Sequence, residues 1–449
     1  MKRFLKILGI VFVIGILLMA VAVSGKIGWN RQQTNKNFFG DGEKKAILAQ
    51  TTKENSFYAG VSQKIITPAE SMYLGGFNFN RKATGVHDNL YARVLVLGDG
   101  YGTRIVIVSL DLLGFLRPDV LQIQREIEIR GIAFGQNVII TSTHTHGAPD
   151  MIGYYGNILK GESGRNFAYA KFVANQIIEA AEEAFDRPEP VDLYTSVADG
   201  GGLCGNKRFP EIIDNEIRTF FVAYKSGKIA ATIVNFGCHP EVLDRRNTLI
   251  TADWPGYMSD NLEQRLGGKA FFVNGALGGM VTPTYKGDYK LAEKFGGEIA
   301  YRVAESYQRR IKILPPYIST FSQEIEIPLQ NQLFKYLIWF GFIPGGTFYD
   351  GKIVTEVNYL QIGNLQVITV PGEITPQVGI KIKSKLKEPK MVWSLANDEI
   401  GYILQKEDWS HQKYSYERTM SLGSETGPKV MAAVDSLKSV SNKLKFHPK

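Results

Sequence analysis

The chain contains little cysteine and little histidine, and its charged residues are nearly balanced. Among 449 residues there are two cysteines, six histidines, 52 basic and 44 acidic side chains. So few cysteines exclude a small scaffold held together by disulfides. A hydrophobic content of 44% excludes a disordered or collagen-like chain. The composition therefore predicts a large folded protein, long enough for more than one domain.

The net charge of +8 does not indicate a nucleic-acid partner, because it is confined to the two ends of the chain. Residues 1–26 and residues 429–449 each contribute +4. Residues 27–428 therefore have no excess of basic side chains with which to neutralise phosphates. We expect no binding of nucleic acid.

The first 26 residues have the pattern of a segment that anchors or exports a protein. Three basic residues precede an uncharged apolar stretch, residues 7–25, which is typical of a membrane-spanning helix. Ala20-Val21-Ala22 is also a small-residue pattern that a signal peptidase could cleave. We expect residues 1–26 to be a membrane anchor or a signal peptide, with the body membrane-anchored outside the cytoplasm or secreted. In an exported protein Cys204 and Cys238 could form a disulfide, but their spacing in sequence does not show it.

The rest of the chain is expected to contain a polar tether at 27–57, a folded body at 58–430 and a basic tail at 431–449. Short apolar runs in the body, typical of buried strands, alternate with helical patterns. The runs are 104–114, 137–147, 229–241, 269–279 and 365–374, and the helical patterns are 118–130, 167–185, 254–266 and 288–309. This alternation predicts an α/β fold in which a layered mixed sheet is flanked by helices, with a metal site at the carboxyl ends of strands.

The apolar segment FKYLIWFGFIPGG, residues 334–346, interrupts this alternation and carries one charge. It is interpreted either as a buried hairpin or helix, or as an exposed apolar lip that touches a membrane or an acyl chain. The sequence leaves both interpretations open.

Three of the six histidines follow predicted strands: His144 and His146 in STHTHG, and His239 in FGCHPE. Ligand sites in α/β sheets form beyond the carboxyl ends of strands. Residues i and i+2 of an extended segment face the same side, so His144 and His146 can face one cavity. A single histidine at a strand end is usually structural, whereas this set favours zinc or a similar metal.

Two further positions are candidates on weaker grounds. Glu373, after the Pro-Gly of VPGEI, could be a fourth metal ligand or an acidic residue in the first turn of the following helix. Thr282, in the glycine-rich strand exit 275–283, could place a hydroxyl at a ligand or lie in a simple turn.

Ten motifs, taken in order, resemble the neutral (non-lysosomal) ceramidases, which are zinc-dependent amidases that split N-acylsphingosine into a sphingoid base and a fatty acid. The resemblance covers about residues 60 to 430. The motifs are AGVSQKIITP (59–68), YLGGFN (73–78), GVHDNLYAR (85–93), VIVSLDLLG (106–114), ITSTHTHGAP (140–149), NFGCHPEVL (235–243), TADWPGYM (251–258), GMVTP (279–283), VPGEITPQ (370–377) and LANDEIGYI (395–403).

The resemblance implies a catalytic domain with zinc as cofactor and a ceramide or other N-acyl lipid as substrate. The zinc ligands that it implies are His144, His239, Glu373 and Tyr402. The other site residues that it implies are His146 beside the metal and near the substrate amide, Tyr416 or Tyr414 at the reacting carbonyl, and Arg208 in the substrate loop.

Two features differ from the family's pattern. Thr282 stands where the family has serine, and its extra methyl stiffens the side chain. The hydroxyl is kept, and it is either the nucleophile or a hydrogen-bond donor. Only 47 residues follow Tyr402, so we expect the family's C-terminal β-sandwich domain to be absent. The N-terminal segment would then keep the enzyme at the membrane.

The sequence thus predicts a zinc-dependent hydrolase of sphingolipid metabolism. Zinc would activate water for attack on the amide, and His146 and Tyr416 would stabilise the oxyanion. Asp111 is either a partner that orients a ligand imidazole or a helix cap. The alternatives are a zinc hydrolase of the same fold that acts on another N-acyl lipid or envelope amide or ester, and a non-catalytic exported surface protein.

Overall fold

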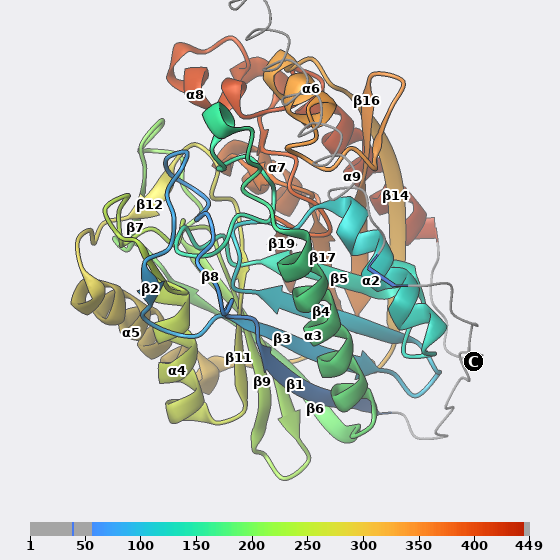
Figure 1. The fold of residues 1–449 in the computed structure, drawn as a ribbon. Helices are drawn as coiled ribbons and strands as arrows, with labels where there is room; N and C mark the ends of the chain where they lie inside the picture. The colour runs from blue at the N-terminus through green and yellow to red at the C-terminus, as the bar shows by residue number, and fades with distance from the viewer. Residues whose placement is uncertain (1–37, 40–55, 444–449) are drawn as a thin grey trace, which may run out of the picture.

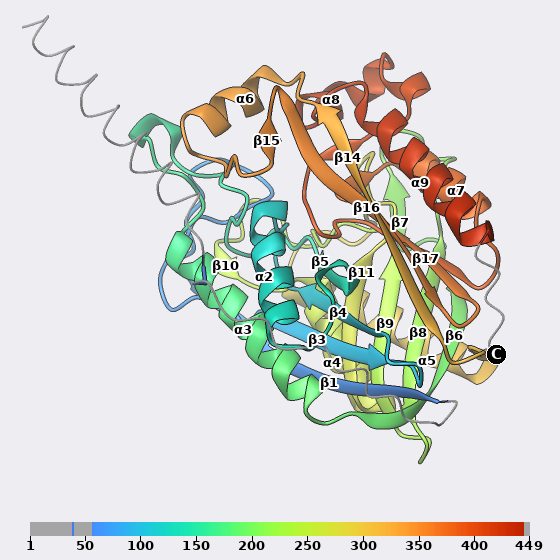
Figure 2. The same cartoon turned by 90° about the vertical axis from the view of Figure 1, so that its right-hand side faces the viewer.

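Two β-sheets lie face to face, and helices cover the outer side of each sheet (Figure 2). The computed structural model describes residues 38–39 and 56–443. The first sheet has nine strands in the order β11 (Lys269–Asn274), β9 (Ile229–Phe236), β8 (Glu216–Tyr224), β6 (Glu189–Asp199), β1 (Phe57–Ile65), β3 (Tyr91–Gly98), β4 (Arg104–Leu110) and β5 (Val138–Ser142), with β13 (Ile311–Lys312) paired to β6.

The second sheet has five strands in the order β14 (Ile318–Pro328), β16 (Lys352–Ile362), β17 (Leu365–Thr369) and β19 (Lys390–Trp393), with β15 (Phe348–Tyr349) paired to β16. Three short pairs lie between and beside the sheets. They are β2 (Gly85–Val86) with β10 (Leu249–Ile250), β7 (Cys204–Asn206) with β12 (Val281–Pro283), and β18 (Glu373–Ile374) with β20 (Tyr402–Ile403).

Four helices cover the outer face of the first sheet: α2 (Arg117–Ile129), α3 (Phe167–Phe185), α4 (Trp254–Leu266) and α5 (Tyr289–Ser306). Two helices cover the second sheet: α7 (Pro376–Ser384) and α9 (Thr426–Lys443). The short helices α6 (Gln332–Trp339) and α8 (Ser415–Thr419) lie at one end of the molecule (Figure 1).

Strands that are buried on both faces explain the unbroken apolar runs of the sequence. In β3, Val94 and Val96 face the helices α2 and α3, whereas Leu95 and Leu97 face the second sheet. Because successive side chains of a strand point to opposite faces, a strand between two apolar layers must be apolar at every position.

The structure confirms the predicted fold class, and every predicted strand and helix forms within a few residues of its expected bounds. The stacking of a second sheet on the first was not predicted. Helix α9 crosses the boundary expected at residue 430 and packs Val434 and Leu437 into the core of the second sheet. The folded body therefore extends to Lys443.

The predicted N-terminal anchor or signal peptide, residues 1–26, lies outside the described residues, as does most of the predicted tether. Within residues 38–39 and 56–443, no helix is long and apolar enough to cross a membrane.

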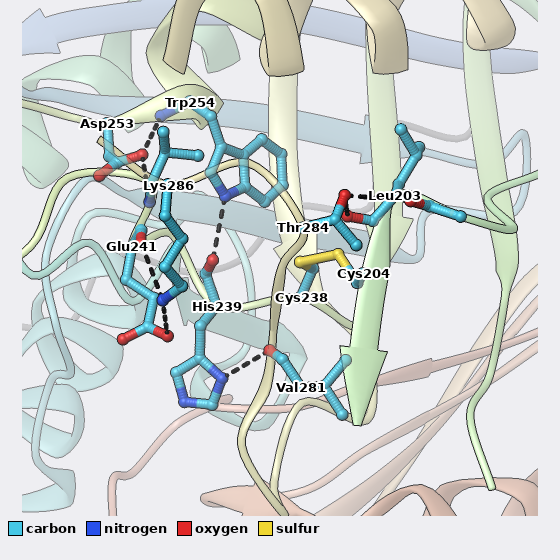
Figure 3. The surroundings of a disulfide bond; sticks show 12 residues. Leu203, Cys204, Cys238, His239, Glu241, Asp253, Trp254, Val281, Thr284 and Lys286 are labelled. Atoms are coloured by element: carbon cyan, nitrogen blue, oxygen red, sulfur yellow. Dashed lines mark hydrogen bonds and ion pairs between the residues drawn. A yellow bond between two sulfur atoms is a disulfide. The ribbon is translucent and has the colours of Figure 1, made fainter. Parts of the chain in front are cut away.

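Cys204 on β7 and Cys238 after β9 form a disulfide, with their Cα atoms 6.2 Å apart (Figure 3). The bond joins the β7–β12 pair to the end of the first sheet. It therefore fixes the segment immediately before His239.

A buried ion pair fixes the start of α2 to the loop that precedes α3. The guanidinium of Arg165 donates to both carboxylate oxygens of Asp119, at 2.6 and 2.7 Å, and also to the carbonyl of Met151 at 3.0 Å. Both side chains of the pair are almost fully buried, at 1% and 2% exposure. Removing one partner would leave the other charge buried without compensation.

We expect Asp119→Ala to lower the free energy of unfolding by about 3–5 kcal/mol, measured by urea denaturation. Glu298→Ala is the matched control, because Glu298 pairs with Arg302 four residues along an exposed helix face. Such a pair contributes about 0.3–0.5 kcal/mol. Equal effects of the two substitutions would contradict the stabilising role of the buried pair.

Candidate active site

The predicted site residues follow strands of both sheets. His144 and His146 follow β5, and His239 follows β9, in the first sheet. Glu373 lies on β18, just after β17 of the second sheet, and Tyr402 lies on β20, after β19 of the same sheet. The pairs β4–β5, β9–β11 and β17–β19 are parallel, so the loops at their carboxyl ends can meet in one place.

His144 is held in a defined orientation by the backbone around it. It adopts a left-handed conformation with φ of 68°, which is uncommon for a residue other than glycine and occurs often at functional sites. Its Nδ1 lies 2.6 Å from the carbonyl oxygen of Leu113. When Nδ1–H donates to that oxygen, the Nε2 lone pair faces the centre of the site.

His239 is held in the same way. Its Nδ1 lies 2.9 Å from the carbonyl oxygen of Val281, and the indole of Trp254 donates to the His239 carbonyl at 3.1 Å (Figure 3). A histidine whose second ring nitrogen bonds a backbone carbonyl is the usual arrangement of a metal ligand.

Glu373 joins the two imidazoles. Its carboxylate oxygens lie 3.5 Å from Nε2 of His144 and 3.1 Å from Nε2 of His239. Burial alone would raise the pKa of Glu373, but the two histidines outweigh it and hold this pKa below its ordinary value. Glu373 therefore belongs to the site, and it lies before the first residue of α7, Pro376.

His146 completes a cluster of three buried imidazoles. Ligand atoms of His144, His146 and His239 all lie within 4.8 Å of one another. Burial, followed by the other two histidines, lowers the pKa of His146 well below its ordinary value, so the ring is neutral. Its Nδ1 has no hydrogen-bond partner among the described residues and lies 3.9 Å from a carboxylate oxygen of Glu241.

These donors fit a divalent transition metal. Neutral imidazole nitrogen and carboxylate oxygen are ligands that zinc accepts, and a buried ring nitrogen without a partner is a group that a bound species would satisfy. The cluster does not identify the metal, because other first-row ions accept the same donors.

Tyr402 and Tyr416 lie close to this cluster. Tyr402 is paired in register with Glu373 across β18 and β20, and its ring centroid is 6.0 Å from that of Tyr416. Burial, then the charge of Glu373, raises the pKa of Tyr416 to about 12. The phenol of Tyr416 is therefore protonated at neutral pH and can donate a hydrogen bond.

The structure distinguishes the two tyrosines that the sequence left open. Tyr416 lines the cavity described below, whereas Tyr414 is fully buried and donates to the side chain of Gln377. Of the two tyrosines, Tyr416 is thus the one that lines the cavity.

Arg208 and Thr282 do not line the cavity. Arg208 donates to Glu417 at 2.6 Å, and Thr282 lies on β12 next to Val281, which accepts from His239. Their roles in binding and catalysis stay predictions.

Both interpretations of Asp111 are wrong. Its carboxylate accepts from Arg93 and from the backbone N–H of Tyr91, at 2.8 and 2.9 Å. Leu113 orients His144 instead.

Two buried acidic residues near the histidines were not among the residues predicted from the sequence. Glu241, two residues after His239, pairs with Lys286 at 2.9 Å (Figure 3). Glu399, in LANDEIGYI, has a pKa raised well above its ordinary value by burial and then by Glu373. Both lie inside the quoted motifs, but an acid after a strand is too common a pattern to indicate a site.

An apolar cavity of about 320 Å³ opens from the histidine cluster. Its wall is mostly aliphatic and aromatic, with contributions from Leu113, Leu116, Ile152, Tyr154, Tyr155, Leu329, Phe334, Ile338, Ile343 and Ile353. The segment 334–346 is neither fully buried nor fully exposed. Its helix α6 directs Phe334 and Ile338 to the cavity, whereas Tyr336 is 58% exposed.

No protein-family model matches the chain, but individual proteins do. The neutral ceramidase of Pseudomonas aeruginosa is 24% identical over 220 residues, which is 46% of this chain and 33% of that protein. The neutral ceramidase of Mycobacterium tuberculosis is 26% identical over 227 residues, 46% of this chain and 35% of that protein. The matched region spans about a third of the length of these relatives.

The neutral ceramidase of Drosophila melanogaster is 33% identical over 99 residues, 21% of this chain and 14% of that protein. Among solved structures, the neutral ceramidase from Pseudomonas aeruginosa superimposes with a TM-score of 0.73 over 88% of this chain and 76% of that one, at 18% identity. This likeness shows a shared fold. Part of the chain is thus similar in sequence to several neutral ceramidases, and the chain shares the fold of the one from Pseudomonas aeruginosa.

Proposed function

We propose that the protein is a metal-dependent amidohydrolase of the ceramidase type, which splits an N-acyl sphingolipid into a sphingoid base and a fatty acid. One observation carries this proposal: His144, His239 and Glu373 converge at the polar end of an apolar cavity. Similarity to several neutral ceramidases supports the reaction class.

We assign the metal to His144, His239, Glu373 and Tyr402, with zinc as the expected ion. His144 and His239 both have Nδ1 on a backbone carbonyl, as metal ligands do, whereas Nδ1 of His146 has no such partner among the described residues. A zinc ion held by such donors supplies Lewis-acid chemistry, activating water and polarising a carbonyl.

The cavity accounts for a substrate with long apolar chains. Transfer of a hydrocarbon chain from water to an apolar wall is favourable by about 0.8 kcal/mol per buried CH₂. Because the three histidines and Glu373 line the same cavity, a chain held on the apolar wall would bring the amide to them. The residues of the wall thereby orient the bond that is broken.

Tyr416 and His146 are placed to stabilise the charge that develops on the amide oxygen. Both line the cavity beside Glu373, and both side chains carry an N–H or O–H at neutral pH. Water adds its hydroxyl to the acyl carbon, the C–N bond breaks, and the amine takes the remaining proton.

We also propose that the folded body lies outside the cytoplasm. The Cys204–Cys238 disulfide supports it, since disulfides persist mainly in oxidising compartments. Residues 1–26 would supply the anchor or the signal.

We expect chelation to abolish release of sphingoid base from ceramide in detergent, and added zinc to restore it. Glu373→Ala should bind less than a tenth of the zinc of the parent protein, measured by elemental analysis, because it removes the carboxylate shared by the two histidines. Glu407→Ala, on an exposed surface turn, is the control. Full turnover by the metal-free protein would exclude the assigned mechanism.

We expect Tyr416→Phe to lower kcat by about 10²–10³, since loss of one oxyanion donor costs about 2.7–4 kcal/mol. Tyr414→Phe is the matched control, because its hydroxyl bonds Gln377 outside the cavity. The measurement is steady-state hydrolysis of ceramide by zinc-loaded protein. If both variants lost activity equally, the assignment of Tyr416 would be wrong.

A further inference from the structure

Six large apolar side chains near the cavity are exposed to solvent, with between 42% and 100% of their surface accessible. We call this set the apolar rim. Its members are Phe79, Ile158, Leu159, Leu333, Tyr336 and Trp339. None of them lines the cavity, but each lies within a few residues of one that does.

Side-chain and backbone contacts join the three segments of the rim. The ring of Tyr154 lies 5.0 Å from that of Phe79 and 6.1 Å from that of Phe334 on α6. The hydroxyl of Ser163 donates to the carbonyl of Phe342 at 2.7 Å, which ties the loop of Leu159 to the segment after α6. The 3₁₀ helix η2 (Ile158–Lys160) and α6 lie at the same end of the molecule in both views (Figures 1 and 2).

Helix α6 is apolar on both of its sides. Phe334 and Ile338, four residues apart, face the cavity, whereas Leu333 and Tyr336, three residues apart, face outward. The outward face of a helix on a water-soluble surface is normally polar. An outward face of this composition indicates a partner that is itself apolar.

We propose that the apolar rim docks on the surface of a lipid bilayer, so that an N-acyl lipid passes from the bilayer directly into the cavity. The substrate in this proposal rests on the proposed function. The docking surface rests on the exposed side chains alone.

Three observations favour a bilayer as the partner. The rim is continuous with the apolar wall of the cavity through Tyr154 and Phe334. Tryptophan and tyrosine, here Trp339 and Tyr336, are the side chains that favour the interface between membrane and water. Residues 332–349 contain one basic and no acidic residue, which avoids repulsion by anionic headgroups.

Fluorescence of a label on Leu159 tests the docking. Among the described residues the two cysteines are joined in a disulfide, and these are the two cysteines of the sequence, so Leu159→Cys in the full chain provides a single thiol for an environment-sensitive dye. The chain is reconstituted in vesicles of phosphatidylcholine with phosphatidylglycerol. We expect a blue-shifted emission that lipid-borne bromine quenches.

Ile311→Cys is the matched control, because Ile311 is 64% exposed on β13 and lies outside the rim. Its dye should retain the emission of a water-exposed dye. If the dye at 159 also remained in water, the proposal would be overturned. A dye at 159 that is shielded from water but not quenched by lipid would mean that protein covers the rim, either a second copy or residues 1–37, and would also overturn it.

A comparison of substrates separates docking from catalysis. In Leu159→Ser/Tyr336→Ser we expect turnover of a bilayer-embedded ceramide to fall at least about tenfold, since burial of one leucine contributes more than the free energy of a tenfold change. Turnover of a soluble short-chain analogue should stay within about twofold, because neither residue lines the cavity. An equal loss on both substrates would overturn the docking role.

Failure of the proposed function gives a different result. If neither substrate were hydrolysed by the parent protein, the ceramidase assignment would fail, while lipid quenching at position 159 would still establish docking.

Discussion

The buried contact between Glu373 and the imidazoles of His144 and His239 is the constraint on which the rest of the site depends. A carboxylate removed from water is costly unless charges or hydrogen bonds compensate for it. Here two ring nitrogens at 3.1 and 3.5 Å provide that compensation. The two histidines follow strands of the first sheet, whereas Glu373 lies on β18 just after β17 of the second, so the contact depends on how the two sheets are stacked.

The stacking of the sheets explains why the site lies where it does. Apolar side chains such as Leu95 and Leu360 fill much of the space between the sheets, and a polar side chain there, such as Asn235, has its hydrogen bonds made by backbone carbonyls. Polar side chains are tolerated where the strands end and the backbone turns. At those turns Leu113 and Val281 offer carbonyl oxygens that fix the orientation of His144 and His239.

The cavity wall and the apolar rim share the helix α6. Phe334 and Ile338 contribute apolar surface to the cavity wall. The outward side of the same helix remains exposed. A single eight-residue helix can present apolar side chains to the cavity and to solvent because its two faces are separated by the helical repeat.

The sequence alone determined the local elements and the positions of His144 and His239 after their strands. Short apolar runs that end in polar residues are typical of buried strands, and a histidine directly after such a strand lies at its carboxyl end, so β5, β9 and the positions of His144 and His239 could be predicted. The ordered motifs indicated a resemblance to the neutral ceramidases, and the sequence matches are to proteins of that name. Glu241 and Glu399 could not be recognised, because acids after strands also cap helices and cover surfaces.

Tertiary structure alone decided which of these residues meet. Local periodicity carries no information on distances between strands far apart in the chain, so the second sheet, the Glu373 contact and the Cys204–Cys238 bond had to be observed. The choice between Tyr416 and Tyr414, which are two residues apart, likewise depended on packing. One faces a cavity and the other faces Gln377, because the short helix α8 begins between them.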